Sequence, residues 1–261
     1  VFGQLTLFGI TAYLAHYFFA HQSWIALGAV LWLHGTTRGV GASGGHEFAH
    51  GTVFKSKWLN SLFVRVWGLL FWFNFHHYKM SHTYHHLYTL HADGDGEVVL
   101  PRNFSLKALR LLQIFTFDFT GFVRAIIRNG RVAVTGRFHD DWSNRIFTPE
   151  QSRPLKRAVR WVRILLLFHM AVIAVSVVFD LWMIAATVTL GSFIGTWWIF
   201  FIGGTMHSGL RDNVPDFRLC TRSIKLDPLS GYLRWNMHYH IEHHMFAAVP
   251  CYNLGRLHRA V

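Results

Sequence analysis

Two long blocks of the chain contain neither lysine nor arginine. They cover residues 1–37 and 164–210, so all 25 Lys and Arg of the 261 residues lie elsewhere. Each block is apolar and long enough for two membrane-crossing helices of about 20 residues joined by a short turn. The pattern therefore predicts an all-α integral membrane protein with four transmembrane helices arranged as two hairpins.

The turns of both hairpins can be placed from the sequence. The first hairpin is predicted to run from Phe2 to Phe19, turn at residues 21–23, and return from Trp24 into the glycine-rich stretch 39–45. The second is predicted from Trp161 to Phe179, with a turn at Asp180 and a return from Leu181 to Gly203. By the positive-inside rule, the basic segments 38–163 and 211–261 belong on the cytoplasmic side. The alternative is that these segments are buried helices of a soluble core.

The composition agrees with a membrane protein. Apolar residues make up 52% of the chain and charged residues 15%, against the roughly 25% charged residues usual in soluble domains. The net charge of +12 is explained by topology, so no nucleic-acid partner is expected. The two cysteines, Cys220 and Cys251, form no CxxC pattern and indicate neither a disulfide framework nor a cysteine metal site. We expect one domain over residues 1–261.

Three segments between the hairpins have distinct patterns. Ser61–Phe75 is apolar but short and contains an arginine, which favours a helix lying against the membrane. Phe104–Arg128 alternates apolar and basic residues in an amphipathic pattern typical of an interfacial helix. Residues 131–160 are polar and basic and are predicted to form a cytoplasmic loop.

Histidines form three clusters, each just beyond a hydrophobic segment on the predicted cytoplasmic side. On a helix, residues spaced by three or four share one face, so each cluster directs its imidazoles to one side. His207 follows the last predicted span and reaches the same side. Eight clustered histidines exceed what one tetrahedral ion binds, so a histidine-rich cytosolic cap with two metal ions is expected. The candidate ligands are His46, His50, His82, His85, His86, His207, His240, His243 and His244.

Carboxylates lie within or near these clusters. The first cluster also reads as HExxH, in which Glu47 would be the general base of a membrane zinc metalloprotease, although this leaves the other clusters unused. Otherwise Glu47 and Glu242 are expected to orient ligand imidazoles through their second nitrogen. The acidic segment 93–97 is expected to be a polar turn, with support of the second cluster by one of its carboxylates as the alternative.

The three clusters in this order, HxxxH, HxxHH and HxxHH, resemble those of the membrane fatty acid desaturase superfamily, whose relatives include lipid hydroxylases, carotenoid ketolases and fatty acid decarboxylases. The resemblance extends to the pattern after the third cluster, with Pro250 and the run from Leu254 to His258. It implies two non-haem iron ions held by the nine histidines, with O2 as co-substrate. The chain departs from the acyl-CoA desaturases at Gly203, where they have asparagine, and from front-end desaturases at His240, where they have glutamine.

The expected function is O2-dependent oxidation of a C–H bond in a fatty acyl or similar lipid chain. Zinc does not undergo the required redox change, whereas iron does. Desaturation, hydroxylation and oxidative decarboxylation remain open. The chain has no CxxC or HPGG-type segment, so a separate electron donor is expected: a ferredoxin, a rubredoxin or cytochrome b5 with its reductase. A metal-binding transporter or a non-enzymatic lipid protein is a further alternative, but its ligands would be expected near the bilayer midplane.

Overall fold

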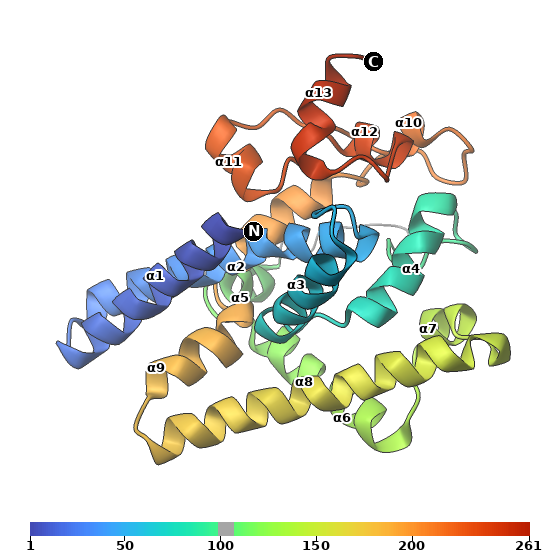
Figure 1. Ribbon diagram of the computed structural model, residues 1–261. Coiled ribbons are helices and arrows are strands. Elements are labelled where there is room, and N and C mark those ends of the chain that lie inside the picture. The colour runs from blue at the N-terminus through green and yellow to red at the C-terminus, as the bar shows by residue number, and fades with distance from the viewer. Residues whose placement is uncertain (99–106) are drawn as a thin grey trace.

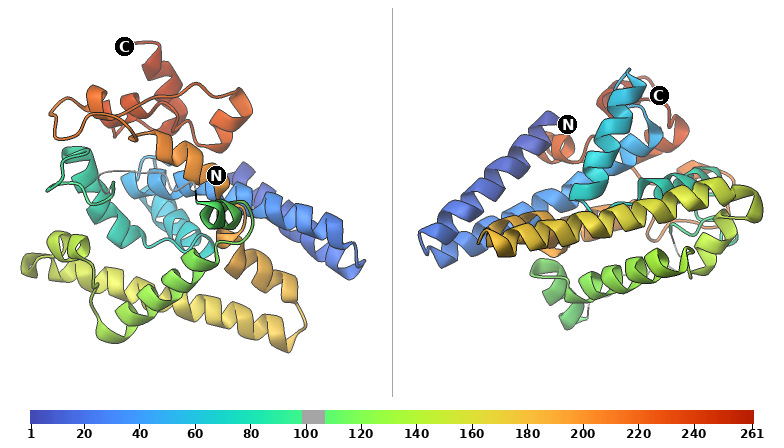
Figure 2. Two further views of the ribbon diagram at one scale, coloured as in Figure 1. Left: turned by 180° about the vertical axis from the view of Figure 1, so that it is seen from behind. Right: turned by 60° about the horizontal axis from the view of Figure 1, so that its bottom comes forward.

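The computed structural model describes residues 1–98 and 107–261. Every regular element in this part of the chain is helical, and the only extended pairing is an isolated bridge between Phe117 and Ile194. The prediction of an all-α fold is therefore confirmed for the described residues. Figure 1 shows the C-terminal elements on one side of the helical body and α6 and α8 on the other, and the reverse view in Figure 2 agrees.

The first hairpin consists of α1 (Phe2–Ala20) and α2 (Trp24–His50). Its turn contains Gln22 in a left-handed conformation, with φ of 53°. Helix α2 continues through the glycine-rich stretch, where the sequence predicted the helix to end. The glycines serve close packing: a Cβ on Gly44 would lie 2.7 Å from the indole nitrogen of Trp67. Helix α2 ends only at Gly51, whose φ of 74° is typical of a glycine C-cap.

The next two helices are α3 (Lys57–Leu70) and α4 (Phe75–Leu87). Helix α3 contributes Trp67, which is fully buried and donates a hydrogen bond from its indole nitrogen to the carbonyl oxygen of Gly41 at 2.8 Å. Helix α4 is capped by Asn74, whose side chain accepts a hydrogen bond from the backbone N–H of His77. The hydrogen bond of Trp67 fixes α3 against α2, and the cap at Asn74 fixes where α4 begins.

The predicted interfacial segment 104–128 forms two helices, α5 (Ala108–Phe115) and α6 (Phe119–Thr135), separated by a cap at Asp118. Its first three residues, 104–106, lie outside the described residues. The prediction of a loop over residues 131–160 is wrong. This segment holds the end of α6, then α7 (Asp141–Ile146), η1 (Pro149–Gln151) and the start of α8 (Ser152–Val178). Its charges lie outside, while Val132, Ile146 and Val159 pack in a small core.

The return leg after α8 is not one continuous helix. It consists of α9 (Trp182–Ile184), the π-helix η2 (Ala185–Leu190), the 3-10 turn η3 (Gly191–Phe193) and, after a break, the π-helix η4 (Ile199–Gly203). At the break, Gly195 donates a backbone hydrogen bond to Thr116 at 2.8 Å. Buried Arg38 donates to the carbonyl oxygen of Thr187 at 3.0 Å. Polar backbone groups released by the irregular turns thus find partners within the protein.

Among the described residues, one helical segment, Pro149–Val178, has the length and apolar character needed to cross a membrane. The predicted topology of four spans is therefore not established by the helices themselves.

The C-terminal part forms a cap of short helices: α10 (Phe217–Cys220), α11 (Pro228–Leu233), α12 (His240–Met245), η5 (Cys251–Asn253) and α13 (Leu254–His258). In Figure 1 this cap lies over the ends of α2 and α4. It is joined to the helical body by a core in which Trp235 and Leu254 pack with Phe48 and Trp67. This core holds α12 beside the last turn of α2.

The packing at Gly44 generates the first prediction. Gly44→Ala should lower the melting temperature of the metal-free protein, because its Cβ would collide with Trp67 and with Trp235 at 2.8 Å. Overpacking of this kind costs about 1–3 kcal/mol. Gly28→Ala on the same helix is the matched control, since no atom lies within 4 Å of the added Cβ. It should leave the melting temperature unchanged or raise it, because alanine favours a helix. Equal melting temperatures for the two variants would contradict this account.

Candidate metal centre

Four elements bring the nine candidate histidines together. His46 and His50 lie in the last turns of α2, and His82, His85 and His86 lie on α4. His240, His243 and His244 come from α12, and His207 lies in the turn after η4. All nine are buried or half-buried. Clusters separated by more than 150 residues in sequence thus meet at one place.

The nine side chains separate into two groups. The five-histidine group contains His46, His50, His82, His86 and His243. The four-histidine group contains His85, His207, His240 and His244. Within each group, one ring nitrogen per residue lies within 4.8 Å of those of the others. The structure thus brings together all nine candidates, eight from the three clusters and the isolated His207, and their binding of metal stays a prediction.

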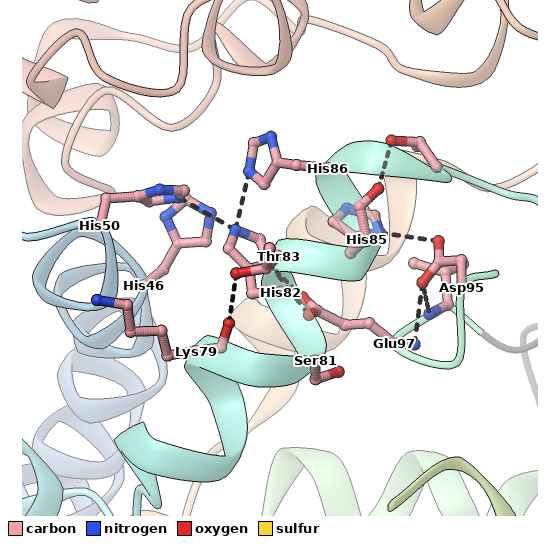
Figure 3. Close-up of polar contacts among 12 residues, drawn as sticks. His46, His50, Lys79, Ser81, His82, Thr83, His85, His86, Asp95 and Glu97 are labelled. Carbon is pink, nitrogen blue, oxygen red and sulfur yellow. Dashed lines mark hydrogen bonds and ion pairs between the residues drawn. The ribbon is translucent and has the colours of Figure 1, made fainter. Parts of the chain in front are cut away.

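The spacing of the ring nitrogens fits metal binding. The Nε2 atom of His82 lies 3.2 Å from Nε2 of His50 and 3.0 Å from Nε2 of His86. Figure 3 shows these nitrogens pointing toward one another. Metal–nitrogen bonds of about 2.0–2.1 Å place neighbouring ligand nitrogens of one ion about 3 Å apart. In addition, the Nε2 atoms of His46 and His244 are buried and have no hydrogen-bond partner.

Carboxylates accept hydrogen bonds from Nδ1 of two histidines of α4, His82 and His85. Asp95 accepts a hydrogen bond from Nδ1 of His85 at 2.8 Å, and Glu97 accepts one from Nδ1 of His82 at 3.0 Å. These contacts fix the proton on Nδ1 and leave the lone pair of Nε2 directed inward. The acidic segment 93–97 is therefore more than a polar turn, as the alternative interpretation proposed. The alternation of acidic residues with glycine was the sequence signal for it.

The two carboxylates differ in their electrostatic setting. Burial alone would raise the pKa of Asp95, but hydrogen bonds from His85 and from the backbone outweigh burial and lower it. Burial raises the pKa of Glu97 to about 7. For His86, burial and then the nearby imidazoles lower the pKa to about 3, so this side chain is neutral and free to bind a metal at neutral pH.

The two glutamates within the clusters have different surroundings. Glu47 accepts a hydrogen bond from Nδ1 of its neighbour His46 at 3.2 Å and lies 3.9 Å from Nδ1 of His243. Glu242 differs from expectation, because it bonds Ser223 at 2.7 Å and also His258, neither of which belongs to the two groups. Hydrogen bonds from these residues outweigh burial and lower the pKa of Glu242. Glu242 thus ties α12 to the rest of the cap.

The geometry does not favour a zinc protease. Glu47 is 1% exposed, and its second oxygen accepts the backbone N–H of Cys251 at 3.1 Å. A general base in such an enzyme must reach a metal-bound water. Glu47 is instead occupied in joining α2 to the cap.

A cavity of about 330 Å³ adjoins both histidine groups. His46 and His82 of the first group and His85, His207 and His240 of the second line it. Much of the remaining wall is apolar and includes Phe73, Ile199, Met206 and Met237. The cavity therefore places apolar surface directly beside the imidazoles.

Comparison with known protein families shows which family the chain belongs to. Residues 22–261 match the family model described as fatty acid desaturase. Because the match covers nearly the whole chain, the protein belongs to the fatty acid desaturase family, and the resemblance seen in the sequence is confirmed. Searches of curated proteins and of solved structures found no match. At the level of the family, membership supports a lipid-modifying oxidoreductase, and the family's general dependence on two irons agrees with two histidine groups.

The contacts of Asp95 generate the second prediction. Its Oδ2 atom accepts from His85 and from the N–H of Leu90, and its Oδ1 atom accepts from the N–H groups of Glu97 and Val98. Asn has only one accepting oxygen, so Asp95→Asn must leave one of these sets without its acceptor. We expect metal affinity to fall about 10- to 100-fold, as is typical for residues that orient ligands.

The measurement is competition for bound metal with a chelator. Asp93→Asn is the matched control, because the Asp93 side chain is fully exposed on the same turn. Its metal affinity should equal that of the wild type. Equal losses in the two variants, or none in either, would show that Asp95 does not position the ligand.

Proposed function

We propose that this protein is a membrane-bound non-haem diiron oxidase that uses O2 to oxidise a C–H bond of a fatty acyl or similar lipid chain. The observation that carries the proposal is the convergence of nine imidazoles into two groups beside one cavity whose wall is partly apolar. In this proposal the five-histidine group holds one iron and the four-histidine group holds the other. Bound iron would supply the redox chemistry that activates O2, which zinc lacks.

The residues of the chain prepare the site for this chemistry. Asp95 and Glu97 keep the protons of His85 and His82 on Nδ1, so that Nε2 of each ring is available to a metal. Buried apolar residues around the cavity, such as Met206 and Met237, limit the access of water. A lipid chain held against these side chains would present one carbon to the centre, and its position decides which bond is oxidised.

We also propose that both hairpins are embedded in the membrane, with the metal centre on the cytoplasmic side. Large apolar side chains are exposed along α8, including Leu167, Met170 and Val178. Others are exposed on the first hairpin, including Tyr13 and Ile25. Many exposed apolar side chains on the same helices support contact with a membrane. The shared core of Phe48, Trp67 and Trp235 supports a single domain.

Each turnover requires two electrons from outside the chain. We propose a separate donor, either a ferredoxin, a rubredoxin or cytochrome b5 with its reductase. The net charge of +12 would attract an acidic carrier to the cytoplasmic side. The reaction type is left to experiment, because desaturation, hydroxylation and decarboxylation share the first hydrogen abstraction.

The third prediction concerns metal content and product. The purified protein should contain about two irons per chain, and with O2, a reductant chain and lipid extract it should yield an oxidised lipid detectable by mass spectrometry. His243→Ala should lose iron and product formation, because His243 is fully buried within the five-histidine group. His139→Ala is the control: His139 is exposed and belongs to neither group.

A single zinc per chain, with the third cluster dispensable for metal binding, would contradict the proposed function. Peptide hydrolysis abolished by Glu47→Gln would instead support the protease.

A further inference from the structure

One buried cation in the cap has no partner among the described residues. Arg234 is 4% exposed, and its Nε and Nη1 atoms are buried without a hydrogen-bond acceptor. No carboxylate of the described chain forms an ion pair with it. A buried charge without a counter-ion is strongly destabilising. Its retention here therefore indicates an anionic ligand.

The guanidinium borders the cavity beside the histidines. Arg234 lines the same cavity of about 330 Å³ as His207 and His240 of the four-histidine group. Met237 and Ile199 also line the cavity, so its wall combines a cation with apolar side chains, and Glu97 is the one carboxylate among the lining residues. Such a surface fits a molecule with an anionic group attached to a hydrocarbon chain.

The local backbone holds Arg234 in this position. Arg234 is the C-cap of α11, and it is followed by two residues with left-handed conformations, Trp235 with φ of 57° and Asn236 with φ of 54°. Consecutive non-glycine residues of this kind are energetically costly and are concentrated at functional sites. Gln4 of α1 accepts a hydrogen bond from the indole of Trp235 and donates one to the carbonyl oxygen of Leu233. Gln4 thus holds the residues on both sides of Arg234, Leu233 and Trp235.

A second buried arginine provides the contrast. Arg38 is 2% exposed, but its guanidinium donates to the carbonyl oxygens of Thr187 and Val188 and to the hydroxyl of Ser192. Arg38 thus stabilises the irregular return leg. Arg234 is buried to a similar extent but has no such acceptors. No contact within the described residues therefore compensates for burying its charge. Although burial lowers the pKa of Arg234 to about 10, the group remains charged at neutral pH.

We propose that Arg234 binds the carboxylate of an unesterified fatty acid and so fixes the carboxyl end of the substrate beside the metal centre. The inference rests on the proposed function and narrows its substrate class. A carboxylate is planar and accepts two parallel hydrogen bonds from a guanidinium. Esters and thioesters carry no charge at this position and would leave Arg234 unpaired. Because the cation and His240 line one cavity, oxidation falls on carbons close to the carboxyl group.

The first test uses the unmodified, iron-loaded protein in detergent. Binding of hexadecanoic acid, of its methyl ester and of acetate is measured by competition against a fluorescent fatty acid. The acid should bind about 100-fold more tightly than the ester, because only the acid neutralises the buried cation. Acetate should bind far more weakly than the acid, since it lacks the chain. Equal binding of acid and ester would overturn the proposal, as would acetate binding as tightly as the acid.

The second test uses variants of Arg234. Arg234→Gln should reduce the affinity for the acid about 100-fold and leave the affinity for the ester unchanged, while Arg234→Lys should retain part of the preference. Arg131→Gln is the control: Arg131 is exposed and lines a neighbouring cavity of about 1020 Å³ between α4 and α6, and does not line the smaller cavity that contains Arg234. Loss of the preference in Arg131→Gln but not in Arg234→Gln would move the anion site to that outer cavity and overturn the proposal.

Two measurements, the position of the oxidised carbon in the product and the iron content, distinguish a failure of the Arg234 assignment from a failure of the proposed oxidase function. With two irons per chain and oxidation at mid-chain carbons of an esterified lipid, the proposed function stands and the assignment of Arg234 fails. If no iron binds and no lipid is oxidised, but the acid still binds through Arg234, the carboxylate site stands and the proposed oxidase fails.

Discussion

The architecture of this protein depends on bringing nine imidazoles together so that their ring nitrogens meet in two groups. Each ring must be turned so that the correct nitrogen faces inward. The hydrogen bonds from Nδ1 do this: His85 donates to Asp95, His82 donates to Glu97, and His207 donates to the carbonyl oxygen of Cys220 at 2.9 Å. The acceptors come from two places in the chain, the 93–97 segment and the cap, so the site forms only when both are assembled with α4.

The rest of the fold can be understood as support for this assembly. The small residues of α2 let Trp67 approach closely, and the same tryptophan packs against Trp235 of the cap with ring centroids 5.6 Å apart. The end of α2 is thus held between α3 and the C-terminal segment. Glu47 adds a polar link, because it contacts His46 on its own helix and the backbone of Cys251 in the cap. A protein whose metal ligands come from distant segments requires such links to keep the ligands in register.

Features that require particular residue types, such as apolar helices and histidine clusters, could be predicted from the sequence. Features that depend on which segments pack together could not. The exclusion of Lys and Arg placed the helix turns at residues 21–23 and at Asp180. The spacing of the histidines identified eight members of the two groups, and the position of His207 after the second hairpin identified the ninth. The basic stretch 131–160 does not form the loop that its sequence predicts, because its many charges hide the few apolar residues, such as Val132 and Val159, that pack in a core. The break in the return leg was missed because nothing local in its apolar sequence marks a π-helix; its released carbonyls depend on Arg38.

The same limit applies at the site. The partners of Glu242 were not predictable, since Ser223 and His258 are brought to it only by the folding of the cap. Nor does the sequence distinguish Arg234 from the other basic residues; only its burial without an acceptor does so. Membership of the fatty acid desaturase family accounts for the three clusters but not for this cation.

The central claim is that the nine imidazoles bind two irons while the carboxylates remain outside the coordination sphere. X-ray absorption at the iron edge tests it most directly, because the outer-shell scattering of imidazole is distinct from that of a carboxylate. The account predicts iron bound chiefly by imidazole nitrogen, in the amount of about two ions per chain, and the same spectrum when Glu97 is replaced by Gln. Iron bound mainly by carboxylate oxygen, or an iron-free protein holding one tetrahedral zinc, would contradict it.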